Sequence, residues 1–105
     1  MQTELYTIQG VENILTPALI YYKDEIFENT RKTIEIAGGA ERLWPHVKSH
    51  KMKKMIEMQM AMGIHRFKCA TLAEVKMVAE YGAEHILLAY PLVGPNIKAF
   101  ISLVK

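Results

Sequence analysis

The sequence predicts an α/β fold built on a parallel sheet, because extended runs and amphipathic helices alternate along the chain. The extended runs begin near residues 18, 43, 67 and 86. A stretch with apolar residues at helical spacing follows each run. The run over 86–90 is apolar throughout, which is typical of a parallel strand covered on both faces. From this pattern alone, a barrel and a doubly wound sheet both fit.

The composition is that of a globular protein. Of the 105 residues, 50% are hydrophobic and 23% are charged, which excludes a largely disordered chain. We interpret residues 1–16 as an N-terminal arm and residues 17–105 as one domain. No apolar run approaches the roughly 18 residues of a membrane helix, so we expect no membrane partner.

Net charge and cysteine content restrict the partners and the compartment that we expect for this protein. The net charge of +2 is small for a nucleic-acid binder, so we expect no nucleic-acid partner. Residues 1–10 lack a basic head followed by an apolar stretch, and we expect no secretory signal. The single cysteine, Cys69, allows no internal disulfide and fits a reducing compartment. We therefore expect a cytoplasmic protein.

The first half of the chain holds two candidate strands and one helix. Residues 18–22 are rich in strand-forming side chains and predict the first strand. Asp24 is expected to cap the following helix, and Gly38 to end it in the left-handed conformation. One face of this helix carries Phe27, Thr30, Ile34 and Ala37. Residues 42–48 form the second candidate strand, although Pro45 cannot donate to a central ladder.

The second half repeats helix and strand with clearer boundaries. A helix over 52–62 has an inward stripe formed by Met52, Met55, Ile56, Gln59 and Met62. Residues 67–70 are the next extended run, and Thr71 with Glu74 then predicts a capping box. After the last strand, Pro95 suits the first position of a final helix. The apolar stripe of that helix comprises Ile97, Phe100, Ile101 and Val104.

Lys48 is the best candidate for chemistry. In parallel α/β folds, reactive groups are located at the carboxyl ends of strands, and Lys48 ends the run over 44–48. The neighbouring Lys51, Lys53 and Lys54 create a positive field that attracts anions and favours a neutral amine. A neutral lysine amine forms an imine with an aldehyde. The alternative is that this lysine-rich segment is only a solvated surface.

Two histidines flank this lysine. If the segment is a strand, His46, Lys48 and His50 point the same way, so we expect them to converge on one pocket. A metal site needs a third ligand, which the local sequence does not offer, and we expect no metal ligands in this chain. Cys69 is either a nucleophile beside a histidine or, as we favour, a small core residue.

Several ordered segments resemble one enzyme family. The run over 45–51, Pro-His-Val-Lys-Ser-His-Lys, resembles the P-H-x-K-T-H-K segment of the D-threonine aldolase and D-serine dehydratase family. The segments 67–74 and 86–95 fit the same family at matching distances, and 16–21 resembles its opening T-P-A-L strand. The resemblance covers nearly all of residues 15–105. This family belongs with the alanine racemase-like, fold type III enzymes that use pyridoxal 5'-phosphate.

The resemblance implies a partial alanine racemase-like barrel domain, namely the first three βα units of a parallel (β/α)8 TIM-type barrel, incomplete in this chain. It implies that Lys48 holds pyridoxal 5'-phosphate as an internal aldimine at the end of the first barrel strand. His46, His50 and Tyr90 are implied to line the cofactor site. The implied reaction is retro-aldol cleavage or dehydration of a small-molecule D-3-hydroxy amino acid. A divalent metal serves the full-length family, with ligands outside this chain.

Some features differ from the family. Trp44 stands where the family often has Arg, and Ser49 replaces the usual Thr. A complete barrel takes about 250 residues, so we expect an N-terminal fragment that is inactive by itself. Its uncovered strand edges favour self-association. Two alternatives stay open: an amino-acid racemase or non-catalytic pyridoxal-phosphate-binding protein of the same fold, and a small α/β interaction module with Lys48 as a surface charge.

Overall fold

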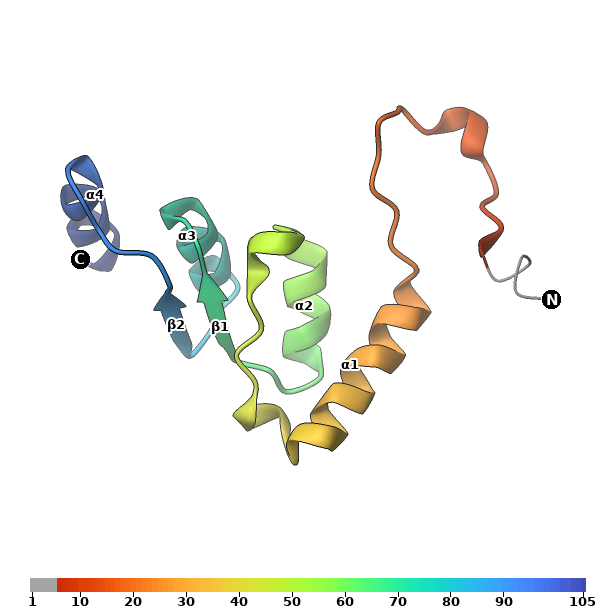
Figure 1. The fold of residues 1–105 in the computed structure, drawn as a ribbon, viewed down its shortest axis with the longest axis horizontal. Coiled ribbons are helices and arrows are strands. Elements are labelled where there is room, and N and C mark those ends of the chain that lie inside the picture. Colours follow the sequence, from red (N-terminus) through yellow and green to blue (C-terminus); the bar gives the residue numbers. More distant parts are fainter. Residues whose placement is uncertain (1–5) are drawn as a thin grey trace.

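Helices and two strands make up the ordered elements of the chain (Figure 1). The computed structural model describes residues 6–105, so residues 1–5 of the predicted arm lie outside the described residues. The helices are α1 (Lys23–Ala37), α2 (Lys53–Ala61), α3 (Leu72–Glu80) and α4 (Pro95–Val104), and the strands are β1 (Arg66–Cys69) and β2 (His85–Leu88). Short 3-10 helices cover Val11–Asn13, Ala40–Arg42 and Val47–Ser49. The predicted α/β class with parallel strands is confirmed.

The strands β1 and β2 form a parallel pair (Figure 1). Arg66 lies opposite His85 at one end of the ladder, and Cys69 lies opposite Leu88 at the other. Parallel neighbours need a crossover connection, which α3 supplies. On its other side, β1 receives a single parallel bridge from His46. Three chain segments therefore run side by side in the same direction.

The predicted strand over 42–48 is wrong apart from that bridge. His46 pairs with Lys68, and the Lys68 N–H donates to the Pro45 carbonyl over 2.9 Å. Pro45 has no N–H to extend a ladder, and the chain turns into the 3-10 helix Val47–Ser49 directly after the bridge. Lys48 therefore lies in this turn and not at the end of a regular strand.

The predicted strand over 18–22 is wrong as well. These residues lie outside any helix or strand, and Leu19 is 75% exposed. Strand-forming side chains make a strand only where a neighbour takes up the backbone hydrogen bonds. The helix that follows begins at Lys23 with Tyr22 as its N-cap residue. Asp24 is therefore not the cap but lies in the first turn, where the helix dipole favours a carboxylate.

Helix signals that depend on local sequence are confirmed. Gly38 ends α1 with a left-handed φ of 84°. At the start of α3, the Glu74 N–H donates to Thr71 Oγ1 over 3.2 Å, as a capping box requires. In α2, the predicted inward residues Met55 and Ile56 are buried. Each of these features needs only residues a few positions apart, which explains why the sequence predicts them well.

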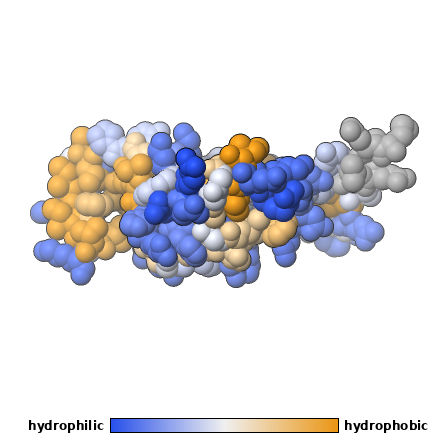
Figure 2. All heavy atoms as spheres, turned by 90° about the horizontal axis from the view of Figure 1, so that it is seen from below, coloured by the Kyte–Doolittle hydropathy of each residue, from blue (hydrophilic) through white to orange (hydrophobic). Residues whose placement is uncertain are grey.

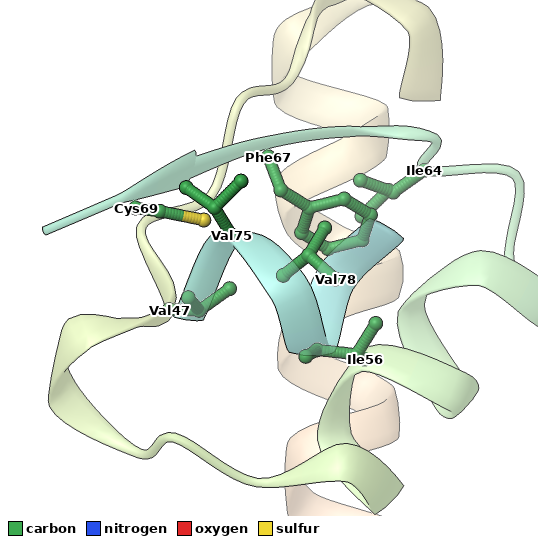
Figure 3. Close-up of a cluster of buried hydrophobic side chains, with 7 residues drawn as sticks. All are labelled: Val47, Ile56, Ile64, Phe67, Cys69, Val75 and Val78. Carbon is green, nitrogen blue, oxygen red and sulfur yellow. The ribbon is translucent and has the colours of Figure 1, made fainter. Parts of the chain in front are cut away.

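Side chains from several elements meet in one apolar core (Figure 3). Its buried members are Val47, Ile56, Ile64, Phe67, Cys69, Val75 and Val78. Successive residues of a strand point to opposite faces, so Phe67 and Cys69 point toward the helices and Arg66 and Lys68 point away. The core therefore lies on the helix side of the sheet, and it includes the residue directly before Lys48.

The C-terminal half is less well covered. The prediction that residues 86–90 are covered on both faces is wrong: Leu87 is 50% exposed, because no layer of residues 6–105 packs on that face. Helix α4 has no buried residue, and Val104 of its predicted stripe is 63% exposed. Phe27, on the face of α1 that it shares with Ile34, is also exposed. The radius of gyration of 16.6 Å exceeds the roughly 13 Å of a compact chain of this length, so the fold is open.

The helices are short and carry charged side chains. The longest, α1, has Arg31 paired with Glu28 over 2.7 Å and with Glu35 over 3.2 Å on its exposed surface. Such exposed pairs contribute little to stability. Among residues 6–105, no helix combines the length and the apolar character needed to cross a membrane.

Candidate functional site

Three chain segments end at the same edge of the sheet. The pairing of β1 with β2 is parallel, and so is the bridge at His46. Lys48 lies two positions after the bridge residue His46. Ala70 directly follows β1, and Tyr90 lies two positions after the end of β2. The carboxyl ends of parallel strands are where α/β enzymes place reactive groups. We call this the carboxyl edge, and Lys48 lies at it.

Val47 fixes the turn that carries Lys48. The Val47 side chain is fully buried in the core with Cys69 and Val75 (Figure 3), whereas Lys48 is exposed. The Val47 carbonyl accepts the Lys51 N–H over 2.9 Å, which closes the turn. Within residues 6–105, Lys48 takes part in no ion pair. Its amine is therefore accessible to a ligand, while its backbone is held by the core.

The His46 side chain caps the backbone of this turn. Its Nδ1 accepts the Lys48 N–H over 3.3 Å and so caps the 3-10 helix. The predicted convergence of His46, Lys48 and His50 by strand alternation is wrong, because the backbone turns over 47–49. The structure brings His46 and Lys48 together through the backbone N–H and not through two side chains.

His50 carries a buried hydrogen-bond donor. Its Nδ1 accepts the Met52 N–H over 3.0 Å, so the neutral ring holds its proton on Nε2. That Nε2 is buried and has no hydrogen-bond partner among the described residues. Burial lowers the pKa of His50 from its ordinary value of 6.5, and the charge of Glu74 opposes this shift. The ring therefore favours the neutral form, with an N–H left for an acceptor.

Glu74 is a buried carboxylate beside the end of β1. It is 3% exposed, and its two oxygens accept hydrogen bonds from the Ala70 N–H over 3.2 Å and the Thr71 hydroxyl over 2.7 Å. Burial, and to a lesser degree the charge of Glu74, raises the pKa of Cys69 to about 11. A buried thiol that keeps its proton is inert, so the interpretation of Cys69 as a core residue is confirmed.

The face of the sheet opposite the helices carries basic and aromatic side chains. This open sheet face is formed by Trp44, His46, Arg66, Lys68, His85 and Leu87. The Arg66 guanidinium lies 5.8 Å from the centroid of the Trp44 ring, and the His85 ring lies 6.0 Å from it. The alternation of outward and inward residues in 66–69 and 85–88 is the sequence signal for this face, and our predictions did not use it.

Tyr90 lies at a different part of the edge. It is half exposed and lines an apolar groove of about 550 Å³ between α3, β2 and α4. Two further cavities, of about 340 and 670 Å³, lie along α1. Lys48, His46 and His50 line none of these three. Lys48 thus presents an exposed amine outside these three cavities.

The segments that meet at the carboxyl edge carry three side chains with N–H donors. Lys48 offers the amine, His50 offers the unpaired N–H, and Lys68 on the adjacent open sheet face offers a cation outside any ion pair of residues 6–105. Among these same described residues, no three His, Cys, Asp or Glu side chains gather in a group that could hold a metal ion.

Comparison with known proteins leaves the family resemblance as a prediction. No protein-family model, curated protein or solved structure matches this chain. Functional inference therefore depends on the residues over 45–51 and on the place of Lys48 in the fold.

Proposed function

We propose that this chain is the N-terminal part of a pyridoxal-phosphate-dependent lyase that acts on D-3-hydroxy amino acids by retro-aldol cleavage or dehydration. In this proposal Lys48 anchors the cofactor. In this proposal the bridge segment, β1 and β2, each followed by a helix, would be the first three βα units of a TIM-type barrel. Support comes from the resemblance of 45–51, 67–74 and 86–95 to this family and from the parallel direction of the three segments.

The place of Lys48 is the observation that carries the proposal. The residue before it is 0% exposed in the core, and Lys48 itself is exposed at the carboxyl edge. Covalent anchoring of a cofactor requires an accessible nucleophile on a backbone that does not move. The fully buried Val47 directly before the lysine-rich segment holds the backbone at Lys48, and this arrangement supports the anchoring role.

The step assigned to Lys48 is a condensation. Lys48 Nζ would hold pyridoxal phosphate through the aldehyde group of the cofactor, and the aldehyde oxygen would leave as water. When bound, the cofactor supplies an electron sink for charge that develops at the substrate α-carbon. His46 holds the backbone at Lys48, because its Nδ1 accepts the Lys48 N–H.

Cofactor binding by the 105-residue chain tests the anchoring role. We expect pyridoxal phosphate to produce a visible absorbance band of protein-bound cofactor that borohydride bleaches. Lys48→Ala should abolish this band, whereas Lys53→Ala, at the first position of α2, should keep it. A band that persists in Lys48→Ala, or that both variants lose equally, would overturn the proposal.

The reaction type is tested with D-threonine and D-serine. A sheet of two strands and one bridge does not close a barrel, so we expect the chain alone to show little or no turnover. In a protein that contains the complete barrel, glycine and acetaldehyde from D-threonine, or pyruvate and ammonia from D-serine, support a lyase. Formation of the L-isomers alone would show a racemase instead.

A further inference from the structure

The two histidines around Lys48 make the same kind of backbone contact. His46 Nδ1 accepts the Lys48 N–H over 3.3 Å, and His50 Nδ1 accepts the Met52 N–H over 3.0 Å. In both cases the donor lies two positions after the histidine, which is the spacing at which asparagine and aspartate side chains close a turn. We call these two hydrogen bonds the histidine clasp.

The clasp holds the backbone on both sides of Lys48. The segment from His46 to Met52 carries this lysine from the sheet to α2 (Figure 1). His46 forms the bridge to β1, and Met52 is the N-cap residue of α2. Between them, the Lys51 N–H donates to the Val47 carbonyl over 2.9 Å. The clasp therefore fixes the turn at the two places where it leaves the sheet and enters the helix.

The clasp is closed only while both rings are neutral. A neutral imidazole has one acceptor nitrogen, whereas the protonated ring has two N–H donors and no acceptor. After proton uptake, each Nδ1 carries a hydrogen directed at the same backbone N–H that it accepts in the neutral form. Two donors make no hydrogen bond with each other, so protonation breaks the contact. Histidine changes its charge between about pH 5 and about pH 8, so the clasp is sensitive to mild acid.

Neighbouring elements bring charged groups to the two rings. Burial lowers the pKa of His50, and the buried carboxylate of Glu74 on α3 opposes this shift. The first turn of α2 adds Lys53 and Lys54, and Lys54 is paired with Glu57 over 3.1 Å. The sheet face that carries His46 also holds Arg66, Lys68 and His85. Because burial dominates at His50, its ring is neutral at neutral pH and its part of the clasp opens as the pH falls.

The clasp lies apart from the exposed apolar end of the molecule. Figure 2 shows a large apolar area at the end that carries α4. Helix α3 contacts both α2 and α4, so it separates the clasp from that end. Each hydrogen bond of the clasp joins residues two positions apart. The clasp therefore does not depend on what covers the apolar end.

We propose that His46 and His50 are positioning residues for Lys48, and that proton uptake by the clasp releases the turn and weakens cofactor attachment in mild acid. While both rings are neutral, they hold the backbone that presents the amine at the carboxyl edge. Once protonated, they leave the Lys48 and Met52 N–H groups without their acceptors, and the amine loses its fixed place. The release of the turn follows from the backbone contacts alone, whereas its effect on attachment rests on the function proposed above.

NMR of the chain without cofactor tests the clasp itself. Between about pH 8 and about pH 5, the amide proton shifts of Lys48 and Met52 should move upfield with the same midpoints as the rings of His46 and His50, because each amide loses its acceptor. The Lys68 amide, which donates to a carbonyl over 2.9 Å, is the control and should not follow either ring. Amide shifts that stay constant while either ring titrates would overturn the clasp.

Two double variants test the effect on attachment. His46→Asn with His50→Asn keeps an acceptor at the same spacing at every pH, whereas His46→Ala with His50→Ala has none at any pH. Each protein is incubated with pyridoxal phosphate and reduced with cyanoborohydride, and mass spectrometry gives the adduct on Lys48 relative to the exposed Lys98 of α4. This ratio cancels the pH dependence that all imine formation shares. Far-UV circular dichroism checks that the variants are folded.

We expect the wild-type ratio to fall at least about threefold between about pH 8 and about pH 5, because both acceptors are lost. The ratio should stay constant in the asparagine variant and be low throughout in the alanine variant. A wild-type ratio that does not change with pH, or that changes equally in the asparagine variant, would overturn the proposal. No preference for Lys48 in any protein at any pH, with amide shifts that follow the rings, would overturn the cofactor function but not the clasp.

Discussion

The backbones of His46 and Lys68 pair in a parallel bridge, and the Lys68 N–H donates to the Pro45 carbonyl over 2.9 Å. This bridge aligns the segment before Lys48 with β1, so the lysine emerges at the carboxyl edge although it lies in a 3-10 turn. The position of the amine therefore depends on the sheet through His46 and on the core through Val47.

Val47→Ala tests the contribution of the core. Removing two methyl groups from a fully buried side chain should lower the free energy of unfolding by about 2 kcal/mol, measured by urea denaturation. It should also weaken pyridoxal phosphate attachment, because the turn loses its anchor. Val93→Ala is the matched control: Val93 is 65% exposed, so its free energy of unfolding should change by less than about 0.5 kcal/mol. Equal losses in both variants would show that Val47 does not anchor the turn.

Thr71→Val tests the capping box of α3. The valine has the shape of threonine but cannot accept the Glu74 N–H or donate to the buried Glu74 carboxylate. We expect the free energy of unfolding to fall by about 1–2 kcal/mol. Thr33→Val, which removes a hydroxyl that donates to Asn29 O on the exposed side of α1, should cost less than about 0.5 kcal/mol. A smaller loss at Thr71 than at Thr33 would contradict this interpretation.

His50 should make stability depend on pH on the acid side of neutrality. Its folded-state pKa is lowered from 6.5, mainly by burial, while the unfolded chain titrates near 6.5. Between these two values the unfolded chain binds more protons, so stability is full above 6.5 and falls as the pH drops through the folded-state pKa.

The His50 contribution is isolated by comparing variants. His50→Asn keeps an acceptor for the Met52 N–H but does not titrate, so urea midpoints measured from about pH 8 to about pH 5 should fall less steeply than those of the wild type. Ser49→Ala, an exposed change in the neighbouring turn that removes no titratable group, should retain the wild-type pH dependence. If His50→Asn retains it as well, burial of this imidazole has no consequence for stability.

Cys69 should be inert in the folded chain. Burial and the nearby Glu74 hold its pKa at about 11, so the thiolate that alkylating agents attack is scarce at neutral pH. We expect iodoacetamide to modify Cys69 only under unfolding conditions, as followed by mass spectrometry. A cysteine introduced at the exposed Ser102 should react readily without denaturant. Rapid alkylation of native Cys69 would restore the nucleophile alternative.

How far the sequence predicts this fold depends on how local each feature is. The Gly38 stop of α1 and the capping box of Thr71 and Glu74 involve neighbours within one helical turn, and the structure confirms them. The strands predicted over 18–22 and 42–48 fail for a different reason. A strand exists only where a distant segment offers backbone partners, and no short window of sequence contains that information.

The candidate site shows the same division. The sequence predicts Lys48 at the end of a strand, whereas the structure places it in a 3-10 turn, two residues after a single parallel bridge. The sequence does not predict that the charge of Glu74 acts on His50 and Cys69. These residues come close to one another only when the chain folds and α3 packs against the core. The cluster of Arg66, Trp44 and His85 likewise forms only when β1 and β2 pair in register.

Reductive trapping followed by peptide mapping tests the anchoring of the cofactor most directly. The chain is incubated with pyridoxal phosphate, reduced with borohydride, digested and examined by mass spectrometry for the modified lysine. We predict that the adduct lies on Lys48 in large excess over its exposed neighbours Lys51 and Lys53. An adduct that falls mainly on another lysine, or that spreads over the surface lysines without preference, would contradict a dedicated role for Lys48.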